Sequence, residues 1–220
     1  MGFYNILEIT KINKIPHLIY ASTSSVYGDT NIFPTPEDAS TDYPKSFYAA
    51  SKKTNEILAY SYSSVHNLKT TGLRFFTVYG PFGRPDMAIY KFANAIKNNK
   101  TLKLFNKGNH FRDFTYVEDV VNLILNIILN EKVSKFQNKN YAKVFNIGNG
   151  KSEKITNIIK IMEDYFNVKS KIEFCKIQPG DVIKTHSNTS KLLKIIRRNN
   201  KTSLKKGLKE YLDWFSEYYD

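Results

Sequence analysis

Residues 19–53 bring together side chains that suit proton transfer. The window reads IYASTSSVYGDTNIFPTPEDASTDYPKSFYAASKK, and it contains the hydroxyl cluster Thr23-Ser24-Ser25 followed by Tyr48 and Lys52. On a helix, Tyr48 and Lys52 stand four residues apart and share a face. An ammonium beside a phenol lowers the pKa of the phenol, so the tyrosine can serve as a base near neutral pH.

The hydroxyl cluster makes this pair more informative than it is alone. A tyrosine and a lysine four apart on a helix usually form only an exposed aliphatic–aromatic contact. A hydroxyl at the end of a neighbouring strand, however, can hold a substrate oxygen in line with the phenol. The combination suits proton removal from an alcohol coupled to hydride transfer onto a nicotinamide.

The hydrophobic pattern predicts the elements that must position these residues. Strands are expected at 17–23, 70–80, 102–105, 143–148 and 170–175, and helices at 46–66, 87–99, 117–130 and 153–166, with the end of another helix at 6–12 and helices over most of the C-terminal part. Strands that alternate with helices predict an α/β fold with a parallel sheet.

Composition limits the class of protein. The chain has 220 residues, a formal charge of +13 and one cysteine, Cys175. An unpaired cysteine, together with the lack of a long apolar run or a signal peptide, predicts a soluble cytoplasmic chain without a membrane span. His17, His66, His110 and His186 form no ligand cluster, so no metal is expected.

The basic stretch at residues 191–209 offers a different hypothesis. It contains eight cations and no acidic residue, and such a patch can bind the phosphates of nucleic acid. No nucleic-acid motif accompanies it, and abundant Lys, Asn and Ile indicate a compositional origin. We therefore regard nucleic-acid binding as the weaker interpretation.

A set of motifs extends along nearly the whole chain in a fixed order: YASTSSVYGD, YPKSFYAASKK, GLRFFTVYGPFGRPDMA, FRDFTYVEDVV, VFNIGNG and QPGDV. In these motifs the sequence resembles the extended short-chain dehydrogenase/reductase superfamily, in its NAD-dependent sugar-nucleotide epimerase/dehydratase branch. The resemblance implies a Rossmann domain that binds NAD and a smaller domain that binds a nucleotide-sugar. It places a partial Rossmann domain at 1–80 and the sugar-nucleotide domain mainly at 81–220, with 115–150 returning to the Rossmann sheet.

The hydroxyl cluster also discriminates within the branch. Related dehydratases carry an Asp-Glu pair before the Val-Tyr-Gly sequence, and decarboxylases carry a Glu there, because those reactions need a carboxyl group. This chain has Ser24 and Ser25 at that position. The resemblance therefore implies epimerisation, and YGPFGRPDMA is most similar to UDP-glucuronate 4-epimerases.

The resemblance implies a role for each matching residue. Tyr48 is the base that removes the proton of the sugar 4-hydroxyl, Thr23 is the active-site hydroxyl, and Lys52 also binds the nicotinamide ribose. Phe75 lies at the nicotinamide end of NAD. The residues implied in substrate binding are Ser24, Ser25, Thr77, Arg84, Arg112, Gln178 and Asp181, with Arg84 suited to an acidic sugar and Arg112 to the diphosphate.

One motif of the family is missing. The sequence contains no Gly-x-x-Gly-x-x-Gly turn, whose helix receives the pyrophosphate of the dinucleotide. We therefore expect an N-terminally truncated enzyme that by itself binds NAD poorly, completed by further N-terminal sequence or by a separate chain. The resemblance also implies a homodimer, formed through a helix bundle that includes residues 46–66.

Three alternatives remain open at this point. The substrate can be a neutral UDP-hexose rather than UDP-glucuronate. The chain can be a non-catalytic remnant that binds a nucleotide-sugar or a partner subunit. The third is the nucleic-acid-binding chain centred on residues 191–209.

Overall fold

The computed structural model describes residues 2–219 except 131–132, 134–140, 179 and 197–200. The helices are α1 (Gly2–Ile12), α2 (Phe47–His66), α3 (Ala88–Lys97), α4 (Val117–Leu129), α6 (Ile155–Phe166), α7 (Ser190–Leu193) and α8 (Leu204–Tyr218). The strands are β1 (Leu18–Thr23), β2 (Thr70–Phe75), β3 (Thr77–Tyr79), β4 (Thr101–Phe105), β5 (Phe111–Tyr116), β6 (Ala142–Ile147), β7 (Ser152–Lys154) and β8 (Lys171–Cys175). The expected α/β class is confirmed.

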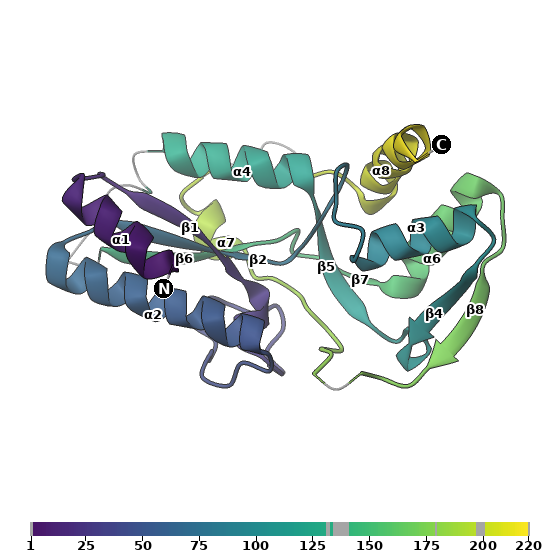
Figure 1. The fold of residues 1–220 in the computed structure, drawn as a ribbon, viewed down its shortest axis with the longest axis horizontal. Coiled ribbons are helices and arrows are strands. Elements are labelled where there is room, and N and C mark those ends of the chain that lie inside the picture. Colours follow the sequence, from purple (N-terminus) through teal and green to yellow (C-terminus); the bar gives the residue numbers. More distant parts are fainter. Residues whose placement is uncertain (1, 131–132, 134–140, 179, 197–200, 220) are drawn as a thin grey trace.

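A parallel three-stranded sheet with the order β1-β2-β6 forms the first lobe. Helix α4 lies on one face of this sheet, and α1 and α2 lie on the other (Figure 1). The central strand β2 is buried almost throughout because both of its faces are covered. Leu73, Phe145 and Ile147 pack towards α4 in a core that includes Leu123 and Ile127.

Helix α2 begins and ends where the sequence predicts. Ser46 caps its N-terminus by accepting a hydrogen bond from the backbone N–H of Ala49, at 3.1 Å. Asn67 ends it in the left-handed conformation, with φ of 55°. This cap pair sets the position of Tyr48 and Lys52 in the first two turns.

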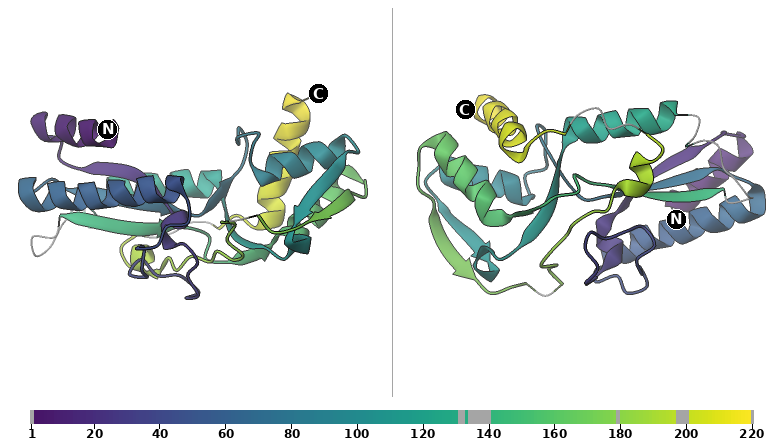
Figure 2. Two further views of the ribbon diagram at one scale, coloured as in Figure 1. Left: turned by 60° about the horizontal axis from the view of Figure 1, so that its bottom comes forward. Right: turned by 180° about the vertical axis from the view of Figure 1, so that it is seen from behind.

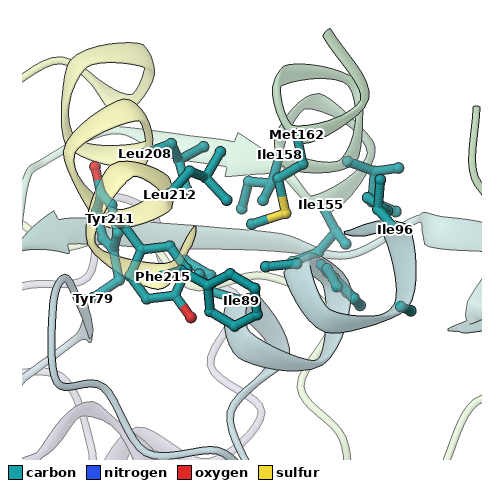
Figure 3. Packing of buried hydrophobic residues seen from close by; sticks show 14 of the residues in the cluster. Tyr79, Ile89, Ile96, Ile155, Ile158, Met162, Leu208, Tyr211, Leu212 and Phe215 are labelled. Carbon is teal, nitrogen blue, oxygen red and sulfur yellow. The ribbon is translucent and has the colours of Figure 1, made fainter. Parts of the chain in front are cut away.

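The second lobe is built from short sheets covered by three helices. Strand β5 pairs with β3 in parallel and with β7 in antiparallel, while β4 pairs with β8. Its core lies between α3, α6 and α8, where Ile89, Met162 and Phe215 are among the buried side chains (Figure 3). The apolar side chains of α3 and α6 recur at helical spacing, which explains why both helices were recognisable in the sequence.

The structure differs from the sequence prediction in two ways: the strand expected at 70–80 is two strands, and β5 and β7 are additional. The run 70–80 is two strands: β2 belongs to the first sheet, and β3 pairs with β5 in the second lobe. Phe76 lies between them, and its backbone N–H donates to the Ile147 carbonyl at the end of β6. Strands β5 and β7 were not predicted, because their pairing depends on partners distant in sequence.

A long loop after β1 contacts the segment that runs from β8 to α7 (Figures 1 and 2). The Thr35 N–H donates to the His186 carbonyl at 2.8 Å, and the Asn188 N–H donates to the Thr35 carbonyl at 3.0 Å. Gly28 starts this loop at φ of 55°, where a Cβ would clash with the Tyr43 carbonyl oxygen. The loop therefore joins the two lobes next to the ends of β1 and β2.

Candidate active site

The hydroxyl cluster lies at the carboxyl end of β1. Thr23 is buried; its Oγ1 accepts a hydrogen bond from the Ser25 N–H and donates one to Ser25 Oγ, both at 3.2 Å. This cap begins the short 3-10 helix Ser24–Tyr27. In open α/β sheets, ligands bind at the carboxyl ends of the parallel strands, which is where the cluster stands.

Tyr48 and Lys52 come together on α2 as their spacing predicts. The Lys52 ammonium lies 6.0 Å from the centroid of the Tyr48 ring and donates to the carbonyl of Ala21 in β1, at 3.1 Å. Tyr48 is 54% exposed, so its phenol is accessible. An ammonium has three donors, and the bond to Ala21 leaves Lys52 able to bind a ligand hydroxyl as well.

A buried ion pair holds α2 against the sheet. Arg74 of β2 donates from Nε and Nη2 to the two carboxylate oxygens of Glu56, each at 2.8 Å, and Ser22 Oγ of β1 donates to Glu56 at 2.6 Å. Burial alone would raise the pKa of Glu56, but the hydrogen bonds and charge of Arg74 outweigh it, and the pKa lies below its usual value. Because Glu56 follows Lys52 by one helical turn, the pair also positions Lys52.

A cavity of about 240 Å³ lies between the two lobes. Five of the sequence-predicted residues line it: Ser24, Ser25, Thr77, Arg112 and Asp181. Six do not line it: Thr23, Tyr48, Lys52, Phe75, Arg84 and Gln178. The cavity therefore brings together five of the residues predicted to bind the substrate, while Tyr48 and Lys52 lie outside its lining on α2.

Several of the remaining six lie close to one another. Thr23 is paired with Phe75 across β1 and β2, so the two stand at the same level of the sheet. Arg84 forms an exposed ion pair with Asp86, which raises the pKa of Arg84, and the Tyr48 phenol adds a smaller contribution. Gln178 is exposed, and its carbonyl accepts from the Asp181 N–H.

Arg112 does not pair with Asp113, the acidic residue next to it in the sequence; its carboxylate partner is Asp181. Its Nη2 donates to Asp181 at 2.7 Å, and its Nη1 donates to the carbonyls of Phe111 and Ile183 at 3.0 and 3.1 Å. Burial lowers the pKa of Arg112, and Asp181 opposes that effect. Asp113 is instead fully buried and accepts from Ser187, Asn149 and Gly150.

Sequence reasoning missed other residues of the cavity. Tyr27, Phe33, Thr35, Lys184 and Thr185 also line it. Phe33 and Thr35 come from the loop after β1, and Lys184 and Thr185 from the segment before α7. The only sequence signal for Lys184 is its position three residues after Asp181 in the QPGDV region.

Two further expectations concern the whole chain. Within the described residues there is no group of three or more His, Cys, Asp or Glu side chains that could hold a metal ion. No helix in the same part of the chain is long and apolar enough to cross a membrane. Residues 197–200 of the basic stretch lie outside the described residues.

Comparison with known proteins gives a consistent result. Residues 1–148 match the family model of the NAD dependent epimerase/dehydratase family. Protein CapI of Staphylococcus aureus is 40% identical over 232 residues, which cover 100% of this chain and 69% of that protein. UDP-glucuronate 4-epimerase 4 of Arabidopsis thaliana is 40% identical over 228 residues, covering 99% of this chain and 52% of that protein. The chain thus spans about half the length of the plant relative.

A solved structure agrees with the fold as well. The UDP-glucuronic acid 4-epimerase from Bacillus cereus, in complex with UDP-glucuronic acid and NAD, superposes with a TM-score of 0.89 at 30% identity. The alignment covers 99% of this chain and 67% of that one. The expected Rossmann-like arrangement of the parallel sheet is therefore confirmed.

Proposed function

The chain belongs to the NAD dependent epimerase/dehydratase family, and from this premise we propose that it epimerises a UDP-sugar at C4 with NAD, the substrate being UDP-glucuronate. The observation that carries the proposal is the composition of the site. Hydroxyls at the end of β1 lie beside a helix that presents Tyr48 and Lys52, and residues 23–25 include no carboxylate. Oxidation and re-reduction of an alcohol need only these groups, whereas loss of water or CO₂ needs a carboxyl group.

The chain's own residues move and hold the proton. Tyr48 takes the proton of the sugar 4-hydroxyl, which leaves a 4-keto sugar once the hydride has left C4, and it later returns the proton to the 4-oxygen when hydride has returned to the opposite face of C4. Thr23 aligns that hydroxyl with the phenol, and Lys52 keeps a positive charge next to the ring. A base placed in this way contributes about 100- to 10,000-fold in rate.

Residues at the carboxyl ends of β1 and β2 fit the nicotinamide end of NAD. Lys52 retains donors that suit the hydroxyls of a ribose, and Phe75 offers an apolar surface at the level of Thr23. Held there, NAD would supply the hydride acceptor for C4 and, once reduced, the donor that returns hydride to the opposite face of C4. We assign only this end of the cofactor, because the sequence contains no glycine-rich turn for its pyrophosphate.

The cavity suits the rest of the substrate. Ser24, Ser25 and Thr77 supply hydroxyls for the sugar, and we assign Arg112 and Asp181, which line the cavity, and Gln178, which is exposed outside its lining, to the nucleotide. Arg84, which is exposed and paired with Asp86, is the cation that we assign to the carboxylate of glucuronate. A neutral UDP-hexose is the alternative substrate, and it would leave Arg84 without an anionic partner on the sugar.

A turnover assay tests the function. The purified chain is incubated with NAD and UDP-glucuronate, and UDP-galacturonate is separated by chromatography. At saturating NAD, which offsets the weak NAD binding expected of this chain, we expect product from the wild type and a loss of about 100- to 10,000-fold in Tyr48→Phe. Calorimetry should show the same UDP-glucuronate binding by both proteins. Tyr60→Phe, exposed on the same helix, is the matched control.

The outcomes separate the hypotheses. Binding of UDP-glucuronate by wild type and Tyr48→Phe alike, with no product at saturating NAD, would identify a non-catalytic nucleotide-sugar-binding chain. Turnover of UDP-glucose but not of UDP-glucuronate would identify a neutral sugar as the substrate. Equal turnover by Tyr48→Phe and Tyr60→Phe would remove Tyr48 from the mechanism.

A further inference from the structure

The charges that line the cavity do not cancel. Its lining contains two cations, Arg112 and Lys184, and one anion, Asp181. Arg112 is paired with Asp181 at 2.7 Å and donates to two backbone carbonyls as well. The charge of Arg112 is therefore largely compensated inside the protein, and the uncompensated charge of the cavity belongs to Lys184.

Lys184 is held over an aromatic ring instead of a carboxylate. Its ammonium lies 4.7 Å from the centroid of the Phe33 ring, and its side chain is half-buried. It forms no ion pair with any of the described acidic residues. A cation–π contact attracts the ammonium without supplying a counter-charge, so the hydrogen-bond donors of Lys184 remain for a ligand.

The backbone fixes Lys184 beside Arg112. Lys184 forms a parallel bridge with Phe111, the residue before Arg112, and the Thr185 N–H donates to the Phe111 carbonyl at 3.0 Å. Phe33 comes from the loop that the same segment contacts at Thr35. The position of the ammonium is thus determined by two elements that meet only in the folded chain.

We propose that Lys184, prearranged by Phe33, is the cation that binds the diphosphate of the nucleotide-sugar; the inference rests on the proposed function and names a residue of the same site. We assign the diphosphate, and not a sugar carboxylate, to Lys184 because Arg84 and Lys184 are two cations at separate positions. Arg84, the cation proposed for the sugar carboxylate, lies outside the cavity lining, whereas Lys184 lines the cavity together with Arg112. Arg112 then orients the phosphates while it stays paired with Asp181.

Calorimetric titration with UDP, UDP-glucose and UDP-glucuronate tests this assignment. We expect Lys184→Gln to raise the Kd about tenfold for all three ligands, which corresponds to about 1.4 kcal/mol, because all three carry the diphosphate. Lys184→Arg keeps the charge and should stay within about twofold of the wild type. Lys160→Gln, an exposed position on α6, removes the same formal charge outside the cavity and should leave the Kd unchanged.

Each other result overturns the assignment. Equal Kd values for Lys184→Gln and Lys160→Gln would show that Lys184 does not bind the ligand, while the proposed epimerisation would stand. A loss confined to UDP-glucuronate would assign Lys184 to the carboxylate instead. Absence of UDP binding and of turnover in the wild type would remove the proposed function together with this inference. Circular dichroism of each variant shows whether it is folded, and Lys184→Met, which keeps the aliphatic stem, replaces Lys184→Gln if that variant unfolds.

Discussion

Removing the carboxylate of Glu56 should lower the stability of the protein more than removing one partner of an exposed ion pair does. The side chains of Arg74 and Glu56 are only 5% and 6% exposed, so neither charge can be hydrated when its partner is lost. Glu56→Ala leaves the Nε and Nη2 donors of Arg74 without acceptors, at about 1 to 3 kcal/mol each. Breaking a buried pair by removing one partner typically costs about 3 to 5 kcal/mol, in agreement with that range.

Thermal and urea unfolding measure this loss. For a chain of this size, each kcal/mol lowers Tm by about 2 to 4 °C, so Glu56→Ala should lower Tm by about 6 to 20 °C. Asp213→Ala is the matched control, because the pair of Lys209 and Asp213 is exposed and contributes at most about 1 kcal/mol. Replacing both charges, in Glu56→Leu with Arg74→Met, should recover most of the loss, since no unpaired buried charge remains.

The effect should also depend on pH. The folded-state pKa of Glu56 lies below its usual value, so the stability that the carboxylate contributes is fully present above the unfolded-state pKa of about 4.3. It is lost as the pH falls through the lower folded-state pKa. The difference in Tm between wild type and Glu56→Ala should therefore be large at pH 7 and shrink below about pH 4. A Tm of Glu56→Ala equal to that of Asp213→Ala at pH 7 would refute the reasoning.

Two further substitutions test the packing of α8 and the proposed role of Arg84. Gly207→Ala in α8 gains about 1 kcal/mol of helix propensity, but its Cβ would clash with the Tyr79 hydroxyl. Overpacking costs about 1 to 3 kcal/mol, so the variant should be less stable than the wild type in urea unfolding. A higher urea midpoint for the variant would contradict this expectation. Arg84→Leu should reduce kcat/KM for UDP-glucuronate by about 10- to 100-fold, which corresponds to the loss of a hydrogen bond to a charged group. The kcat/KM for UDP-glucose should stay nearly unchanged. An equal loss for both sugars would mean that Arg84 does not read the carboxylate.

Local patterns in the sequence determined most of the secondary structure and one half of the site. The spacing of Tyr48 and Lys52 is a property of one helix, and Ser46 and Asn67 mark its ends, so both residues could be assigned a shared face without a fold. The hydroxyls of residues 23–25 follow an apolar run that predicts a strand, and the structure has the partly buried strand β1 there. These inferences succeeded because each rests on interactions between residues close in sequence.

Only the tertiary structure decided what surrounds these residues. The partner of Arg112 is Asp181, 69 residues away, and the neighbour of Lys184 is Phe33 in the opposite lobe. The run 70–80 divides into two strands because its second half pairs with β5, and not because of its own composition. Side-chain type and periodicity carry no information about such contacts, since these contacts depend on which elements the chain packs together. The helices, the strands and the spacing of Tyr48 and Lys52 were therefore determined locally, and the fold determined the charge balance of the cavity.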